Sequence, residues 1–247
     1  MFDPPTLLII VLTFVVAGLV KGVLGLGLPT VALGLLTASI GLQPAMALML
    51  APSFATNAWQ AIGERHGREA LVQIWPFLLA ATVTIPVGAM ALPVADPARL
   101  AALLGVLLIL YAVSGLARPS LRVPARFEPW LGTLAGGLNG ILTGLTGSFV
   151  VPGVLYLQAI GLPRDQLIQA MGMLFVMSTV ALAVSLGAQS LLDGELGLLS
   201  MAAILPAFAG MAVGRKLRGC LSEAAFRKLF FVGLALLGLH IVLRSLG

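Results

Sequence analysis

The sequence has few charged residues: 9% of its 247 residues are Asp, Glu, Lys or Arg, whereas 60% are hydrophobic. A soluble domain carries about a quarter charged residues. This deficit, with a mean hydropathy of +1.09, predicts an integral membrane protein. Too few residues remain outside the bilayer to build a soluble catalytic domain.

Cysteine and histidine are also scarce. Cys220 is the single cysteine, which excludes an intramolecular disulfide and a thiolate cluster for a metal. His66 and His240 have no metal-like spacing, and neither is placed to act as a base for Ser148. No phosphate-binding loop is present. We therefore expect no cofactor, no metal and no enzymatic activity.

The hydrophobic residues form eight continuous runs, each long enough to cross a bilayer. Continuous runs predict α-helices, because the strands of a membrane barrel alternate apolar and polar residues. The runs cover roughly residues 6–36, 43–63, 70–93, 99–117, 130–160, 166–189, 195–214 and 225–245.

Two of these runs carry glycine and proline in their middle. They are AGLVKGVLGLGLPTVALGLL at 17–36 and AGGLNGILTGLTGSFVVPGVLYL at 135–157. Such a run predicts a helix that breaks and restarts, and a pair of them in matching places is typical of a transporter's binding site. The residues expected at the breaks are Gly25, Gly27, Pro29, Gly144, Gly147 and Pro152.

The two halves of the chain resemble each other. AGLVKG at 17–22 matches AGGLNG at 135–140, and Ile-Gly-Leu occurs at both 40–42 and 160–162. The longest polar stretch, 117–129, lies between the halves. We expect one membrane domain, 1–247, made of a first repeat at 1–120 and a second at 121–247. The repeated glycines also have a small-xxx-small spacing, which close helix packing explains equally well.

Basic residues predict the orientation of the halves. If each broken run enters and returns, eleven Lys and Arg residues fall on one face, with Arg99 and Arg244 opposite. With this number of membrane crossings, both termini lie outside and the two halves have opposite orientations, which makes them an inverted repeat. Each half would have a broken glycine-rich helix pair and about three further spanning helices. The eleven are Arg65, Arg68, Arg118, Arg122, Arg126, Arg164, Arg215, Lys216, Arg218, Arg227 and Lys228.

A few polar residues inside the runs are candidates for binding. Lys21 is either an anion-binding ammonium or a lysine that extends to the interface. Asn57 and Gln60 share one face of a predicted helix, and Asn139 and Gln169 are polar residues of the second half. Hydrogen bonding between helices is the alternative for these amides.

Four segments together resemble the sulfite exporter family, the TauE/SafE group of membrane anion permeases. They are VKGVLGLGLPTVALGLL (20–36), APSFATNAWQ (51–60), NGILTGLTGSFVVP (139–152) and GRKLRGCLSEAAFRKLFFVGLALLGLHIVLR (214–244). The resemblance implies a multi-pass protein of two homologous halves in the bacterial inner membrane. It places Lys21, Asn57 and Gln60 in a first half-site, and Asn139 and Gln169 in a second.

By this resemblance the substrate is a small sulfur-containing anion such as sulfite, a sulfonate or sulfoacetate. From the inverted halves we expect a secondary transporter that works by alternating access, and an inside-negative potential favours export of the anion. The expected partners are this anion and membrane lipid, without nucleic acid. Whether transport is coupled to a proton or another ion, and whether the protein forms a homo-oligomer, stay open. Two alternatives also stay open: a passive anion channel, and a non-transporting membrane subunit that acts through partners.

Overall fold

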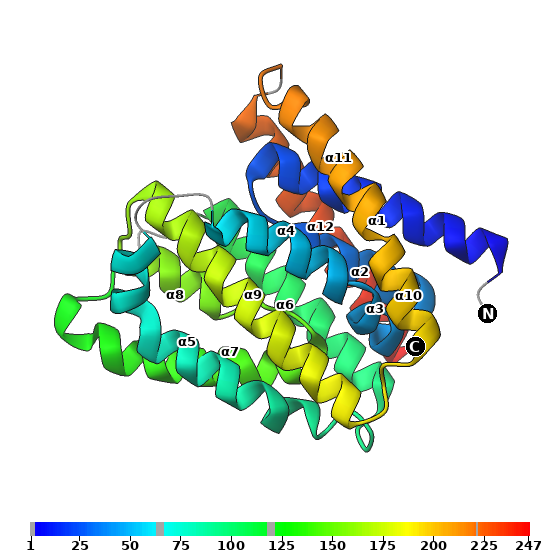
Figure 1. The fold of residues 1–247 in the computed structure, drawn as a ribbon, viewed down its shortest axis with the longest axis horizontal. Helices are drawn as coiled ribbons and strands as arrows, with labels where there is room; N and C mark the ends of the chain where they lie inside the picture. The colour runs from blue at the N-terminus through cyan, green and yellow to red at the C-terminus, as the bar shows by residue number, and fades with distance from the viewer. Residues whose placement is uncertain (1–2, 63–66, 118–121, 221) are drawn as a thin grey trace. The chain divides into compact units, whose positions relative to one another are not determined.

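The computed structural model describes residues 3–62, 67–117, 122–220 and 222–247 (Figure 1). Within these ranges there is no β-strand, and six helical stretches are long and apolar enough to cross a membrane. The expected all-α, multi-pass fold class is therefore confirmed. Arg65, His66 and Arg118, which entered the arguments from sequence, lie outside the described residues.

The helices follow one another along the chain with short connections. They are α1 (Pro4–Leu24), α2 (Leu28–Ile40), α3 (Leu42–Leu48), α4 (Leu50–Ile62), α5 (Gly67–Ala89), α6 (Pro97–Ala117), the 3-10 turn η1 (Ala125–Phe127), α7 (Glu128–Thr146), α8 (Gly153–Ala159), α9 (Arg164–Ala188), α10 (Gly194–Ala202), α11 (Ile204–Leu217) and α12 (Glu223–Leu246).

These helices form two compact units, and each unit draws on both halves of the sequence. The first unit comprises residues 1–52, 95–117 and 190–247, which include α1, α2, α3, α6, α10, α11 and α12. The second comprises residues 53–94 and 118–189, which include α5, α7, α8, α9 and α4 from Ser53 onward.

In the first unit, α1 packs closely along α11 because glycines line the contact. A Cβ atom added at Gly18 would lie 2.1 Å from the carbonyl oxygen of Ala207, and one at Gly22 would lie 2.4 Å from that of Met211. Gly214 of α11 approaches α1 in the same way. Only glycine allows backbones to come this near, as in small-residue interfaces of membrane helices.

In the second unit, α5 and α7 pack in the same manner. A Cβ at Gly136 would lie 2.3 Å from the carbonyl oxygen of Phe77, and one at Gly140 would lie 2.1 Å from that of Ala81. The Thr84 hydroxyl also donates to the carbonyl of Gly137 at 2.9 Å. Close packing therefore accounts for the repeated glycines of α1 and α7.

The apolar run 43–63, which the sequence suggests is one span, is two helices, α3 and α4. Pro52 has no N–H to donate to the carbonyl of Leu48, four residues earlier. That carbonyl instead accepts from the Ser200 hydroxyl at 2.9 Å, and the hydroxyl oxygen of Ser200 in turn accepts from the N–H of Ala51 at 3.0 Å. A side chain of α10 thus separates the two helices.

Candidate functional site

The first helix break lies between α1 and α2, at residues 25–27, where the sequence predicts one. Gly25 ends α1 with φ +80°, and its N–H donates to the carbonyl of Lys21 at 2.8 Å. Gly27 precedes α2 with φ +102°. Residues with side chains rarely adopt this left-handed conformation, so the two glycines let the chain turn within three residues. Pro29 lies in the first turn of α2.

Two cationic side chains lie at the end of α1. Lys21, in the last turn, is 4% exposed. This burial inside the protein favours an interior role over extension to the membrane surface. Arg218, at the end of α11, donates to the carbonyls of Val23 at 2.8 Å and Gly22 at 2.9 Å. These bonds satisfy carbonyls that the end of a helix leaves without partners.

The second break lies between α7 and α8, at residues 147–152. Gly147 ends α7 with φ +73°. Hydroxyl groups then stabilise the non-helical chain: Thr143 donates to the carbonyl of Ser148 at 2.9 Å, and Thr146 accepts from the N–H of Ser148 at 3.2 Å. The break is therefore an ordered, buried segment that its own helix holds in place.

Several hydrogen-bond donors of this second break have no partner among the described residues. They include the side-chain amide nitrogen of Asn139 and the hydroxyl of Ser148, both in buried side chains. The backbone N–H groups of residues 149–151 also make no bond to another described residue. Buried polar groups nearly always have partners, so such a cluster indicates a place where a ligand or water binds.

Asn139 is held in a defined orientation by Gly153. The amide oxygen of Asn139 accepts from the Gly153 N–H, the first of α8, at 2.9 Å. A Cβ at Gly153 would lie 2.7 Å from that oxygen, so any other residue would displace the amide. Sequence reasoning missed Gly153, although its place directly after Pro152 at the start of a short apolar helix was a visible signal.

The other amides lie where α4 meets α9. Asn57 and Gln169 are both almost fully buried. The Gln60 amide nitrogen donates to the carbonyl of Ile168 at 3.1 Å, and a Cβ at Gly172 would lie 3.1 Å from the backbone nitrogen of Ala61. The Gln60 bond therefore joins two helices, and the binding role of Asn57, Gln60 and Gln169 stays a prediction.

The predicted residues divide between the two units. The first unit holds Lys21, Gly25, Gly27 and Pro29. The second holds Asn57, Gln60, Asn139, Gln169, Gly144, Gly147 and Pro152. Asn57 and Gln60 thus share a unit with Asn139 rather than with Lys21. Gly144 lies within α7, where a Cβ would be 2.2 Å from the carbonyl oxygen of Ile85, and Pro152 directly precedes α8.

Metal-ligating side chains do not gather in the described ranges: no three His, Cys, Asp or Glu residues there are placed to hold a metal ion. The second break instead presents neutral donors, namely an amide, a hydroxyl and backbone N–H groups. Hydrogen-bond donors of this kind are suited to hold the oxygen atoms of an anion, because those oxygens accept hydrogen bonds.

Comparison with known proteins gives one match. No curated protein and no solved structure matches the chain. The family model described as "Sulfite exporter TauE/SafE" matches residues 10–241, which is nearly the whole chain. This agrees with the family suspected from the glycine-rich motifs and with the six membrane-length helices. The protein is a multi-pass membrane protein that belongs to the sulfite exporter TauE/SafE family.

Proposed function

We propose that this protein is a secondary transporter that exports small sulfur-containing oxyanions across the bacterial inner membrane. Sulfite, short sulfonates and sulfoacetate are the substrates to expect. The observation that carries the proposal is the cluster of buried donors at the second break that have no partner among the described residues, formed by Asn139, Ser148 and the N–H groups of residues 149–151. Membership of an exporter family supports it.

The chemistry of this cluster suits a sulfonate or sulfite group. Such a group presents three oxygen atoms in a compact array, and its sulfur-bound oxygens accept hydrogen bonds. Neutral donors satisfy these oxygens without a fixed positive charge. A site on a transport path must bind well enough to admit the ion and weakly enough to release it. The other half of the sequence contributes a buried basic side chain, Lys21.

We also propose that the halves form an inverted repeat that works by alternating access. The aligned segments AGLVKG and AGGLNG lie in α1 and α7, the helices that precede the two breaks. Each of these helices packs, through its glycines, on a helix of the opposite half: α1 on α11, and α7 on α5. Packing of each half on helices of the other half is expected for two duplicated halves that interlock. In this arrangement we expect both termini to lie outside.

The driving force follows from the charge of the substrate. An inside-negative potential of 100 mV favours the exit of each negative charge by about 2.3 kcal/mol. A potential of this size gives nearly a 50-fold gradient at equilibrium, since 1.4 kcal/mol is a factor of ten. Coupling to a proton or another ion would add to this force or oppose it.

The test is transport by purified protein in liposomes, with Ser148→Ala compared with Ser185→Ala. Both serines are buried, but the Ser185 hydroxyl donates within its own helix, to the carbonyl of Ala181 at 2.7 Å. Losing a hydrogen bond to a charged ligand costs about 1.5–3 kcal/mol, or roughly ten- to a hundredfold in affinity. We expect Ser148→Ala to weaken sulfite and sulfoacetate efflux by that factor and Ser185→Ala to leave it unchanged. Equal efflux by the two variants would refute the site.

A further inference from the structure

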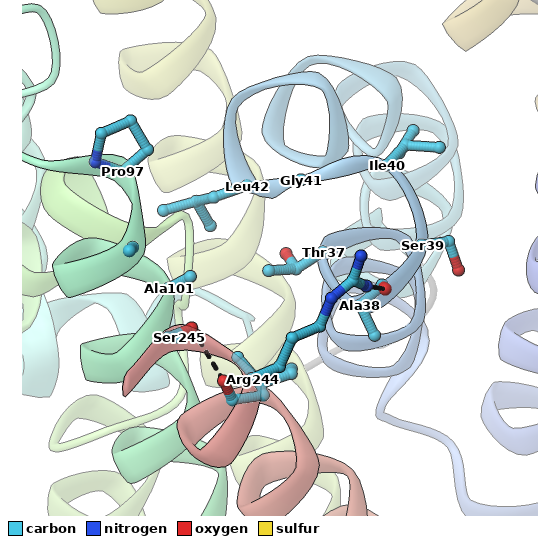
Figure 2. A pocket seen from close by; sticks show the side chains of 12 residues that line it. Thr37, Ala38, Ser39, Ile40, Gly41, Leu42, Pro97, Ala101, Arg244 and Ser245 are labelled. Atoms are coloured by element: carbon cyan, nitrogen blue, oxygen red, sulfur yellow. Dashed lines mark hydrogen bonds between the residues drawn. The ribbon is translucent and has the colours of Figure 1, made fainter. Parts of the chain in front are cut away.

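A cavity lies in the first unit, and its lining includes none of the residues of either helix break. Its volume is about 460 Å³, within the range of small-molecule sites. Figure 2 shows that it forms where the end of α2, the start of α6 and the last turns of α12 meet. Both α6 and α12 are long enough to cross the membrane, so their ends belong to the membrane surface.

The polar wall of this cavity holds a guanidinium and a hydroxyl. Arg244 is exposed, donates to the carbonyl of Ala38, and forms no ion pair in the described part of the chain. Its other donors remain available, because a guanidinium has five. The hydroxyl of Thr37 is buried, with the residue 6% exposed, and has no hydrogen-bond partner among the described residues. Figure 2 shows both side chains on the lining of the cavity.

Two further hydroxyls line the cavity, but those of Ser39 and Ser245 donate to carbonyls of their own helices, and the other lining residues are apolar. Ile40 and Leu42 contribute from the turn between α2 and α3, Ala101 from α6 and Ile241 from α12. A small inorganic anion obtains no binding free energy from such apolar surface, because it has no apolar part to bury. An amphiphile would bury its acyl chain there and place its anionic headgroup beside the guanidinium. The cavity therefore combines the two properties of a lipid site.

We propose that this cavity binds the anionic headgroup of a membrane phospholipid. Arg244 and Thr37 hold the phosphate, and the first part of an acyl chain lies along the apolar lining. Basic pockets between membrane helices recognise lipid headgroups through the same combination of charge and apolar surface. The residues of this site differ from those of the proposed transport site. The two proposals are therefore tested by different measurements, transport in liposomes for one and lipid-dependent thermal stability for the other.

The experiment measures the thermal stability of the whole protein in detergent, with and without added phosphatidylglycerol or phosphatidylcholine. A lipid that binds the folded protein raises the melting temperature by mass action. The test variant is Arg244→Gln, which keeps an amide to bond the Ala38 carbonyl but removes the charge. Its control is Arg99→Gln on α6, because Arg99 is also basic, pairs with Asp96 at 3.7 Å, and has a side chain 86% exposed.

We expect phosphatidylglycerol to raise the melting temperature of the wild type and of Arg99→Gln, and most of that rise to vanish in Arg244→Gln. Thr37→Val should reduce the rise and leave the lipid-free protein at least as stable, since it removes a buried hydroxyl without a partner. An equal rise in both arginine variants would overturn the proposal, because general attraction to a basic protein would then explain it. An equal rise with phosphatidylcholine would overturn it too.

A further arm separates the lipid from free anions. Inorganic phosphate and methanesulfonate are added at the concentration of the lipid headgroup. No Arg244-dependent rise is expected, because these ions cannot use the apolar lining. A rise with either ion that matches the rise with phosphatidylglycerol, and that Arg244→Gln removes, would assign the cavity to free oxyanions and overturn the lipid assignment.

Discussion

Close packing of α5 on α7 can be tested at two glycines of the same helix. A Cβ added at Gly140 would lie 2.0 Å from the Thr84 hydroxyl oxygen and 2.1 Å from the carbonyl oxygen of Ala81. At Gly137, one turn away, the nearest atom would be a methyl carbon of Thr84 at 4.0 Å. Optimal contact between heavy atoms is about 3.5 Å. Gly140→Ala must therefore move α5 and α7 apart by about 1.5 Å, whereas Gly137→Ala moves nothing.

The two variants should therefore change stability in opposite directions. Overpacking costs about 1–3 kcal/mol, and a 1.5 Å displacement belongs at the upper end. Alanine inside a helix recovers about 0.5–1 kcal/mol over glycine in both variants. Gly140→Ala should lose about 2 kcal/mol, or about 4–8 °C in melting temperature, and Gly137→Ala should be unchanged or slightly more stable. Fluorescence of Trp130, which lies on α7, follows unfolding in detergent. Equal melting temperatures would refute the packing argument.

Two further predictions concern the cations of the first break. Arg218→Gln removes the guanidinium that donates to two carbonyls at the end of α1 at 2.8 and 2.9 Å, so it should lower the free energy of unfolding by about 1 kcal/mol. Arg215→Gln is its control, because the Arg215 side chain bonds to no backbone carbonyl of the described residues and donates to the sulfur of Met211 in its own helix, at 3.7 Å. Similar melting temperatures for both would contradict the role of Arg218. Lys21→Met should reduce the rise in melting temperature that sulfite and sulfonates give the wild type, and a rise of unchanged size would exclude Lys21 from anion binding.

The class of fold and the place of the breaks could be predicted from the sequence because both depend on local composition. Runs of about 20 apolar residues have few structures available to them in a bilayer. Glycine near residues 25–27 and 147 determines where a helix ends, since the left-handed conformation that turns the chain requires glycine. These properties reside in neighbouring residues, so no knowledge of the tertiary structure was needed.

The contacts that stabilise the breaks could not be predicted in this way. Arg218 binds carbonyls nearly 200 residues earlier in the chain, and a hydropathy pattern contains no signal for such a pair. Ser200 separates α3 from α4 through a hydroxyl that resembles any other serine in an apolar helix. Gly153 is informative only once its N–H is known to face Asn139. Each of these residues acts through a partner far away or in another helix.

Although each break follows a helix that carries one of the aligned segments, the chemistry of the two breaks differs, and this difference predicts a division of roles. The first break has the basic side chains of Lys21 and Arg218, whereas the second has the neutral donors of Asn139 and Ser148. A charge attracts every anion of the same valence about equally. Directed donors discriminate by the positions of the oxygen atoms. Lys21→Met should therefore reduce binding of sulfonates and matched carboxylates by the same factor, whereas Ser148→Ala should reduce sulfonate binding more than carboxylate binding. If Lys21→Met altered this selectivity and Ser148→Ala did not, the roles would be reversed.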